Sequence, residues 1–403
     1  MRIYFLLIRL AALCGHRKAR LMVQGQNEVW ERLESIRDSR TQQKVQWIWV
    51  HVSSVGEFEQ ARPILERLRA EHSPYKVLLT FFSPSGYEMR KNYDQVDLVT
   101  YLPFATRANA RRFLECVQPV ISLFVKYEFW PAYLNELKQR GSTTYIIAAI
   151  FRKSQLFFKP WGGWYRRLLR CFTRLYVQDA ASKELLERYG ITNVVVAGDT
   201  RFDRVTRIAS ESKDIPLAQL FSEGPVIVAG STWPPDEELL ARYIEEREDV
   251  RLILVPHEIH EEHLHDIFQR WQGRLVRYTR ANEKNINQNR TLLLDTMGML
   301  SSIYKYANVA YIGGGFGEGI HNTLEAAVWG VPVLFGPNYH KFREAHGLIQ
   351  AGAGFSVTNY KEFKTAMDEA LLRADEIGQK AKAYVQSELG ATEIIYKSLE
   401  FRV

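Results

Sequence analysis

A glutamate stands where a predicted strand gives way to a predicted helix. The strand covers residues 47–52, small residues form a turn, and Glu57 opens the amphipathic stretch 57–71. A carboxylate at such a bend lies at the carboxyl edge of a parallel sheet, where open α/β folds bind ligands. We interpret Glu57 as the best general-base candidate in the chain. The alternative is a glutamate that merely complements the dipole at a helix start.

Two further charged motifs follow strands of the first half. Lys126 and Glu128 come directly after the predicted strand 119–125 and also emerge at the carboxyl edge. They are either site residues or a buried ion pair. Arg201 follows the last strand of this half, and we expect it to face a cleft between domains, where arginine clamps phosphate or carboxylate. The alternative for Arg201 is an ordinary interdomain salt bridge.

A glycine-rich loop in the second half could bind a phosphate. A strand ends at Ile312, three glycines follow, and a helix is predicted to begin near His321. Glycines let the backbone approach a phosphate, and a helix start supplies unpaired N–H groups. Glu325 lies one turn into this helix and could accept hydrogen bonds from a ribose. The spacing is neither Walker A nor a convincing NAD fingerprint, and the alternative is a turn capped by Asn322.

Two more strand ends carry polar residues. Asp295 or Thr296 is predicted to cap a helix over residues 297–306. Four histidines crowd residues 257–265 beside glutamates, but the zinc-hydrolase spacing is absent. We therefore favour a solvated helix face over a metal site, with His257 alone near a ligand.

The composition bounds the class of protein. The chain has 403 residues, 46% of them hydrophobic and 25% charged, which indicates a globular protein of two domains. A net charge of +7 favours anionic partners such as phosphorylated substrates or acidic membranes. Nucleic-acid binding ranks low because the aromatic residues do not interleave with basic clusters. Three cysteines without pair spacing indicate a reducing compartment.

Short apolar runs alternate with helical patterns along the chain, which predicts parallel sheets covered by helices. The predicted strands are 47–52, 76–81, 97–101, 119–125, 143–149, 173–177 and 193–197, then 225–229, 251–255, 274–278, 291–294, 308–312 and 331–335. Two successive sets indicate two Rossmann-like domains. The polar segment 206–224 should hold the boundary, and the helical pattern 361–403 could return to the first domain.

The N-terminal segment is apolar with a basic border. A helix from Arg2 to Val23 is too short in its apolar part to span a bilayer and carries Arg9 within it. We expect it to lie in the plane of a membrane. A helix docked on its own domain is the equal alternative.

Five motifs in this order resemble the Kdo (3-deoxy-D-manno-octulosonic acid) transferase family over nearly the whole chain. The matching segments are Ser54-Val55-Gly56-Glu57, Glu128-Phe129-Trp130-Pro131, Gly198-Asp199-Thr200-Arg201-Phe202-Asp203, Asp295-Thr296-Met297-Gly298-Met299 and Gly319-Ile320-His321-Asn322-Thr323-Leu324-Glu325-Ala326. The departures are Pro256-His257-Glu258 for the family's Pro-Arg-His, Met299 for Glu, Thr323 for Pro and Arg201 for Lys.

The resemblance implies a GT-B architecture, in which two Rossmann-like domains face a central cleft. It implies a membrane-associating helix at 1–25, an acceptor domain at 26–205 and a CMP-sugar domain at 206–403. The implied catalytic residues are Glu57, Glu128 and Arg201, and the implied nucleotide contacts are Pro256, His257, Met297, Gly298, Met299, Asn322, Thr323, Leu324 and Glu325.

The resemblance also implies an inverting transfer of Kdo from CMP-Kdo to the primary hydroxyl of a lipid A precursor. CMP leaves as a phosphate monoester anion, so neither a metal nor a further cofactor is expected. The implied partners are CMP-Kdo, the lipid precursor and an anionic membrane surface, and the implied location is the cytoplasmic face of a Gram-negative inner membrane. Two alternatives stay open, a UDP-sugar transferase or epimerase of the same fold and a non-catalytic nucleotide-sugar binder. The oligomeric state is open as well.

Overall fold

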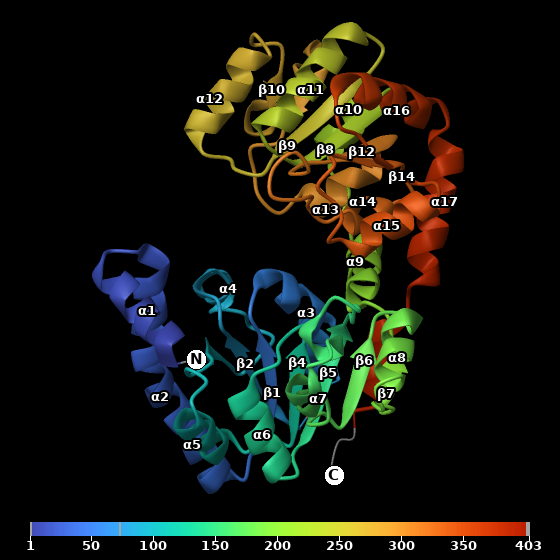
Figure 1. Ribbon diagram of the computed structural model, residues 1–403. Helices are drawn as coiled ribbons and strands as arrows, with labels where there is room; N and C mark the ends of the chain where they lie inside the picture. Colours follow the sequence, from blue (N-terminus) through green and yellow to red (C-terminus); the bar gives the residue numbers. More distant parts are fainter. Residues whose placement is uncertain (1, 72–73, 400–403) are drawn as a thin grey trace. The chain divides into compact units, whose positions relative to one another are not determined.

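The computed structural model describes residues 2–71 and 74–399 and divides the chain into two units. Unit 1 runs to Asp203 and resumes at Gly390, and unit 2 is Arg204–Leu389. Each unit holds one parallel seven-stranded sheet with helices on both faces (Figure 1). The predicted pair of Rossmann-like domains is therefore confirmed.

The sheet of unit 1 has the order β3-β2-β1-β4-β5-β6-β7. Its strands are β1 (Trp47–Val52), β2 (Lys76–Phe81), β3 (Leu98–Tyr101), β4 (Ile121–Val125), β5 (Thr143–Ala149), β6 (Arg174–Val177) and β7 (Val194–Val196). Strands β2 and β3 are added on one side of β1, and strands β4 to β7 are then added in sequence on its other side. The junction of β1 and β4 is thus a topological switch point, where such folds bind ligands at the strands' carboxyl ends.

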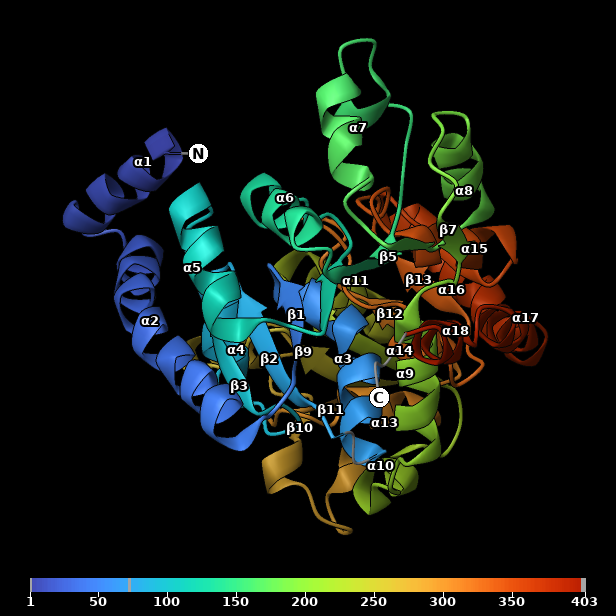
Figure 2. The ribbon, with the colours of Figure 1, turned by 90° about the horizontal axis from the view of Figure 1, so that it is seen from below.

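Helices cover both faces of this sheet because every strand is apolar on both sides. In β1, Trp47 and Trp49 pack into one core, and Ile48 and Val50 pack into the other. The first core takes residues from α2 (Arg17–Gln43), α5 (Arg107–Val117), α6 (Pro131–Gln139), α7 (Gly163–Leu169) and α8 (Ala180–Glu187). The second takes residues from α3 (Val55–Ala70), α4 (Pro84–Arg90) and α18 (Ala391–Lys397). Figure 2 shows α5 and α6 on one side of the sheet and α3 and α18 on the other.

Unit 2 repeats the plan with the order β10-β11-β9-β8-β12-β13-β14, and its switch point lies between β8 and β12. The strands are β8 (Val226–Thr232), β9 (Arg251–Pro256), β10 (Val276–Arg277), β11 (Thr291–Leu293), β12 (Val309–Ile312), β13 (Val333–Phe335) and β14 (Gly354–Ser356). The helices are α10 (Pro216–Phe221), α11 (Pro234–Glu246), α12 (Glu261–Arg270), α13 (Leu300–Ile303), α14 (Leu324–Ala327), α15 (Arg343–Gln350), α16 (Tyr360–Leu372) and α17 (Ala374–Ser387). Helices α11, α12 and α16 share one buried core with the sheet.

The C-terminal segment returns to unit 1. Asp203, within α9 (Thr200–Ser210), accepts hydrogen bonds from the N–H groups of Gly390 (2.7 Å) and Thr392 (2.6 Å). Ile395 of α18 is buried in the core on the α3 face. The division of the chain at Asp203 falls two residues before the expected start of the second domain at 206.

The N-terminal helix is shorter than expected. The prediction of one helix over Arg2–Val23 is wrong, because the chain breaks after α1 (Arg2–Leu13) at Gly15, whose φ of +94° no helix can hold. His16 then caps α2, which runs on to Gln43. On α1, Phe5 stacks on Phe104, and three leucines stay exposed, namely Leu7, Leu10 and Leu13. No helix among the described residues is long and apolar enough to cross a membrane.

Several other elements differ from the expectation. The helices predicted over 297–306 and 321–329 shrink to single turns, α13 with a short 3-10 extension and α14. Strand β14 was not predicted, and the expected linker 206–224 contains the end of α9 and all of α10. The shortness of α13, α14 and β14 explains why they differ, since three or four residues carry no hydrophobic period.

Candidate functional site

Glu57 is held where β1 turns into α3. Ser54 caps the helix, its hydroxyl accepting from the Glu57 N–H (3.3 Å), and the Glu57 carboxylate accepts from the Ser53 N–H (2.6 Å). This arrangement is a variant of the capping box, because the carboxylate accepts from the N–H of Ser53, which precedes the N-cap Ser54. It also fixes a carboxylate at the carboxyl end of β1, beside the switch point. The expected strand, turn and helix start are confirmed, and both interpretations of Glu57 describe the same geometry.

The surroundings of Glu57 give its carboxyl group an unusual acidity. Burial and, to a lesser extent, the charge of Glu128 raise its pKa to about 7, against the opposing effects of the Ser53 N–H and Lys126. A carboxylate with a pKa near 7 accepts a proton well and still spends much of its time ionised at neutral pH. Glu57 can therefore serve as a general base, which a solvated capping glutamate would do poorly.

Glu128 follows β4 and carries the opposite perturbation. Burial raises its pKa, but hydrogen bonding and charge from His51 outweigh this and hold the pKa below its usual range. Its Oε2 lies 3.0 Å from His51 Nε2 and accepts from Trp130 Nε1. The partners of Glu128 thus include an imidazole and an indole, and the expected Lys–Glu pair stays a prediction. Two adjacent carboxyl groups whose pKa values are pushed apart are typical of acid–base sites.

The backbone around this pair is strained. Lys126, directly after β4, has φ of +60°, and Ala148 at the end of β5 has φ of +53°. Left-handed backbone costs a non-glycine residue roughly 1 kcal/mol or more and gathers at functional sites. Lys126 is close enough to lower the pKa of Glu57. The residue with this strained backbone, Lys126, is therefore also the cation that acts on Glu57.

Arg201 is held by a neighbour in sequence. Its guanidinium contacts both oxygens of the buried Asp199, with distances of 3.0 Å from Nε and 2.8 Å from Nη2 to Oδ2. Gln60 also donates to Asp199 (3.1 Å). This salt bridge lies within unit 1 and therefore does not test the interdomain salt bridge named as the alternative, and the role of Arg201 on a phosphate stays a prediction.

In unit 2 the switch point brings two small-residue segments into contact. A Cβ on Gly313 would lie 2.3 Å from the Ser231 carbonyl oxygen, so only glycine fits where β12 ends. Ser231 itself has φ of +54° at an irregularity in the β8–β9 pairing. Backbone therefore packs directly on backbone at this point, where the glycine-rich loop after β12 begins.

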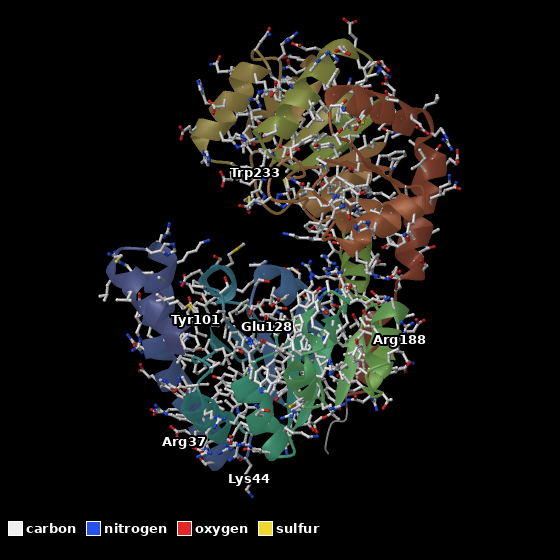
Figure 3. All side chains as sticks on the ribbon, viewed as in Figure 1. Arg37, Lys44, Tyr101, Glu128, Arg188 and Trp233 are labelled. Carbon is white, nitrogen blue, oxygen red and sulfur yellow. The ribbon has the colours of Figure 1, made fainter. Side chains whose placement is uncertain are left out.

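A cavity of about 630 Å³ opens beside this glycine-rich loop, a size typical of small-molecule sites. Trp233, labelled in Figure 3, is one of the residues that line the cavity. Its ring stacks on that of His257, with 4.9 Å between the ring centroids, and the His257 ring stacks on that of His321, with 4.4 Å between the centroids. Burial, with a contribution from His257, lowers the pKa of His321 to about 4, so this imidazole is neutral at pH 7. It accepts from Trp233 Nε1 (3.3 Å).

The cavity includes only part of the expected nucleotide contacts. His257 lines it, and Pro256 precedes it at the end of β9. Its other lining residues, which the sequence did not single out as contacts, include Trp233, Asp236, Phe316 and Phe342. The signal for Trp233 was available in Gly230-Ser231-Thr232-Trp233-Pro234, where small residues end a strand and proline starts a helix.

The remaining expected contacts form a second group around α13 and α14. Glu325 accepts from Ser301 Oγ (2.8 Å) and from Asn322 Nδ2 (3.0 Å), which joins the two short helices. Asn322 also accepts from the N–H of Leu324, and the buried Thr323 hydroxyl has no hydrogen-bond partner among the described residues. Near α13, Met297 is exposed, Gly298 has φ of +86°, and Met299 Sδ accepts from Thr296. These contacts stay predictions.

Asp295 does not cap α13, contrary to expectation. It accepts from the Arg277 guanidinium (2.8 Å) and the Thr279 N–H (3.0 Å), and it thereby binds the loop after β10. The helix begins after Met299 instead.

The histidines of residues 257–265 have separate structural partners. His260 caps α12, and His263 is buried against Glu237, with 3.0 Å between Nε2 and Oε1. Within residues 2–71 and 74–399, no group of three or more potential ligands is arranged to hold a metal ion. The expected solvated face is thus only partly correct, because His263 is a buried partner.

Comparison with known proteins shows which enzymes the chain resembles. Residues 27–204 match the family model described as 3-deoxy-D-manno-octulosonic-acid transferase. The enzyme of that name from Aquifex aeolicus is 29% identical over 83% of this chain and 89% of its own length. The one from Chlamydia trachomatis serovar A is 25% identical over 88% of this chain and 86% of its own length.

The fold is shared more widely. The structure of UDP-GlcNAc 2-epimerase from Neisseria meningitidis bound to UDP-GlcNAc superposes with a TM-score of 0.60 over 88% of this chain and 99% of that one, at 15% identity. Such a likeness shows a common GT-B type fold and no more. The sequence relatives carry the functional class, that of a glycosyltransferase, because the chain is similar over most of its length to 3-deoxy-D-manno-octulosonic acid transferases.

Proposed function

We propose that the chain transfers Kdo from CMP-Kdo to the primary hydroxyl of a lipid A precursor, with inversion at the anomeric carbon. The similarity to 3-deoxy-D-manno-octulosonic acid transferases supports the sugar that is transferred, and the CMP carrier is taken from the resemblance of the sequence motifs. The observation that carries the mechanism is Glu57, a half-buried carboxylate with a pKa of about 7 at the switch point of unit 1.

In the proposed step, the acceptor hydroxyl loses its proton to Glu57 while its oxygen attacks the anomeric carbon. The bond from that carbon to the phosphate oxygen breaks, and CMP leaves. A positioned general base contributes about a hundred- to ten-thousandfold to such a rate. Lys126 supports the step by stabilising the ionised form of Glu57 before the proton arrives.

Donor binding is assigned in this proposal to unit 2. The cavity beside the glycine-rich loop has imidazoles, aromatic rings and loop backbone as its lining, which suit a sugar or base ring. Glu325 would accept from the ribose, and Arg201 would assist at the leaving phosphate. Because α13 and α14 are single turns, individual N–H groups near 297–299 and 321–323 would act there in place of a helix dipole.

We further propose a peripheral location on the cytoplasmic face of the inner membrane. The exposed leucines of α1 and the net charge of +7 support contact with an anionic bilayer, in which the lipid acceptor resides.

The test is an assay of purified protein with CMP-Kdo and detergent-dispersed lipid A precursor. Glu57→Gln should lose at least a hundredfold in turnover. Glu71→Gln, at the exposed end of the same helix, is the matched control and should keep wild-type turnover. Normal turnover in folded Glu57→Gln would reject the base, and competition by UDP in place of CMP would reject the donor. The anomeric configuration of the product reports inversion.

A further inference from the structure

A fully buried histidine bridges three strands beneath the candidate base. His51 lies one residue before the end of β1, and its ring contacts Thr80 of β2 and Glu128 after β4. Nδ1 lies 2.9 Å from Thr80 Oγ1 and 3.1 Å from the Thr80 carbonyl oxygen, and Nε2 lies 3.0 Å from Glu128 Oε2. Both nitrogens are therefore engaged with partners inside the protein.

The partners determine which ring nitrogen carries hydrogen. An ionised carboxylate only accepts, so His51 Nε2 must donate to Glu128. At the other nitrogen, the Thr80 hydroxyl accepts from Trp49 Nε1 (2.8 Å), which leaves its own hydrogen for Nδ1 or for the Val50 carbonyl. The Nε2–H thus points at Glu128 whether the ring is neutral or protonated.

Aromatic side chains isolate this contact from water. The His51 ring lies within 6.3 Å of the rings of Trp49, Phe124 and Trp130, measured between ring centroids. Hydrogen bonds to a carboxylate are stronger in such surroundings than in water, and a missing one is costlier. Hydrogen bonds from His51, Trp130 and the Ser53 side chain therefore help Glu128 to remain charged, and His51 has the largest effect among them.

The charge of Glu128 in turn acts on Glu57. Among the charged groups, Glu57 is influenced by Glu128 and Lys126, with opposite signs. If Glu128 were protonated, one of the two causes that make Glu57 a stronger base would vanish. The hydrogen bond between His51 and Glu128 thereby decides whether Glu57 or Glu128 receives a proton.

We propose that His51 is a positioning residue that keeps Glu128 as the ionised member of the pair, so that the proton of the acceptor hydroxyl goes to Glu57. The inference rests on the proposed function for the identity of the acceptor. Its core, the distribution of one proton over two carboxyl groups, is independent of turnover and can be measured without substrate.

The first experiment follows protonation by infrared difference titration of the purified protein between pH 5 and 8. Wild type should show one carboxylic acid band with a midpoint near pH 7 that disappears in Glu57→Gln. His51→Leu should add a second band in this range that disappears when Glu128→Gln is also introduced. A Glu128 band already present in wild type would overturn the proposal, even if His51→Leu failed to fold.

The second experiment measures the pH profile of Kdo transfer. In His51→Leu, we expect the acidic limb to move down by about one pH unit, because a protonated Glu128 no longer raises the pKa of Glu57. His51→Gln, which keeps an N–H toward Glu128, should restore the limb to within a few tenths of a unit. A lowered rate with an unmoved limb would indicate a purely structural role and reject the proposal. Absence of transfer by wild type, with the infrared result intact, would reject only the proposed function.

Discussion

The carboxylate of Asp236 accepts a hydrogen bond from the backbone N–H of Gly314 (3.0 Å) and so joins the first turn of α11 to the glycine-rich loop after β12. The same carboxylate accepts from the Trp233 N–H (2.9 Å) and the Tyr311 hydroxyl (2.7 Å). Burial raises the pKa of Asp236, yet three donors converge on it. One side chain thus fixes the two segments that form the walls of the cavity.

Removing this carboxylate should loosen the cavity. We expect Asp236→Ala to lower the unfolding free energy by about 2–3 kcal/mol, because buried donors lose their acceptor. CMP affinity should fall roughly tenfold as the loop loses its fixed position. Calorimetric titration with CMP and urea unfolding measure the two effects. Glu238→Ala, an exposed position on the same helix, should change neither. Unchanged CMP affinity in folded Asp236→Ala would show that the loop holds its shape without the carboxylate.

Glu57 should make the protein less stable as the pH rises. Its folded pKa of about 7 exceeds the unfolded value of 4.5, so the folded state binds the extra proton between these values and stability declines across pH 4.5–7. Well above pH 7 Glu57 is ionised in both states, and the folded state then carries the whole free-energy cost of its ionised carboxylate. Glu57→Gln should therefore be more stable than wild type by about 1–3 kcal/mol at pH 8 and little different at pH 4.5. Urea unfolding at both pH values checks this, and an equal difference at the two would show that Glu57 has an ordinary pKa.

Strand positions were the most predictable part of the fold. The bounds of β1, β2 and β5 agree with the predicted ranges, because continuous apolar runs end sharply at polar or small residues. Glu57 could likewise be found from sequence, since the strand, the turn and the helix start lie next to one another. By contrast, β14 and the single-turn helices carry too few residues for a pattern.

Contacts between distant segments could not be predicted. His51 and Glu128 are 77 residues apart, and nothing local in either motif reports their hydrogen bond. The same holds for the stack of Trp233, His257 and His321, which three different strand ends contribute. Such partners follow from the order of the strands in the sheet, which the sequence pattern leaves open.

The leucines of α1 should govern attachment to membranes. Leu7, Leu10 and Leu13 are exposed, whereas Phe5 docks the helix on unit 1 through Phe104. Replacing the three leucines by serine removes apolar contact area and should weaken binding to anionic vesicles at least tenfold, with Tm unchanged. Co-sedimentation with phosphatidylglycerol vesicles measures it, and turnover on detergent-dispersed acceptor is the control. Undiminished sedimentation would assign membrane contact to another surface.

Thr323 offers a test of the expected nucleotide contacts. Its hydroxyl is buried and lacks a partner among the described residues, which costs about 1–3 kcal/mol. Thr323→Val keeps the shape and removes the hydroxyl, so we expect the unfolding free energy of the free protein to rise by about 1 kcal/mol. If Thr323 donates to the donor nucleotide, CMP affinity should fall several-fold in the same variant, whereas Thr358→Val, at an exposed position of unit 2, should leave it unchanged. Greater stability with undiminished CMP affinity would remove Thr323 from the nucleotide site.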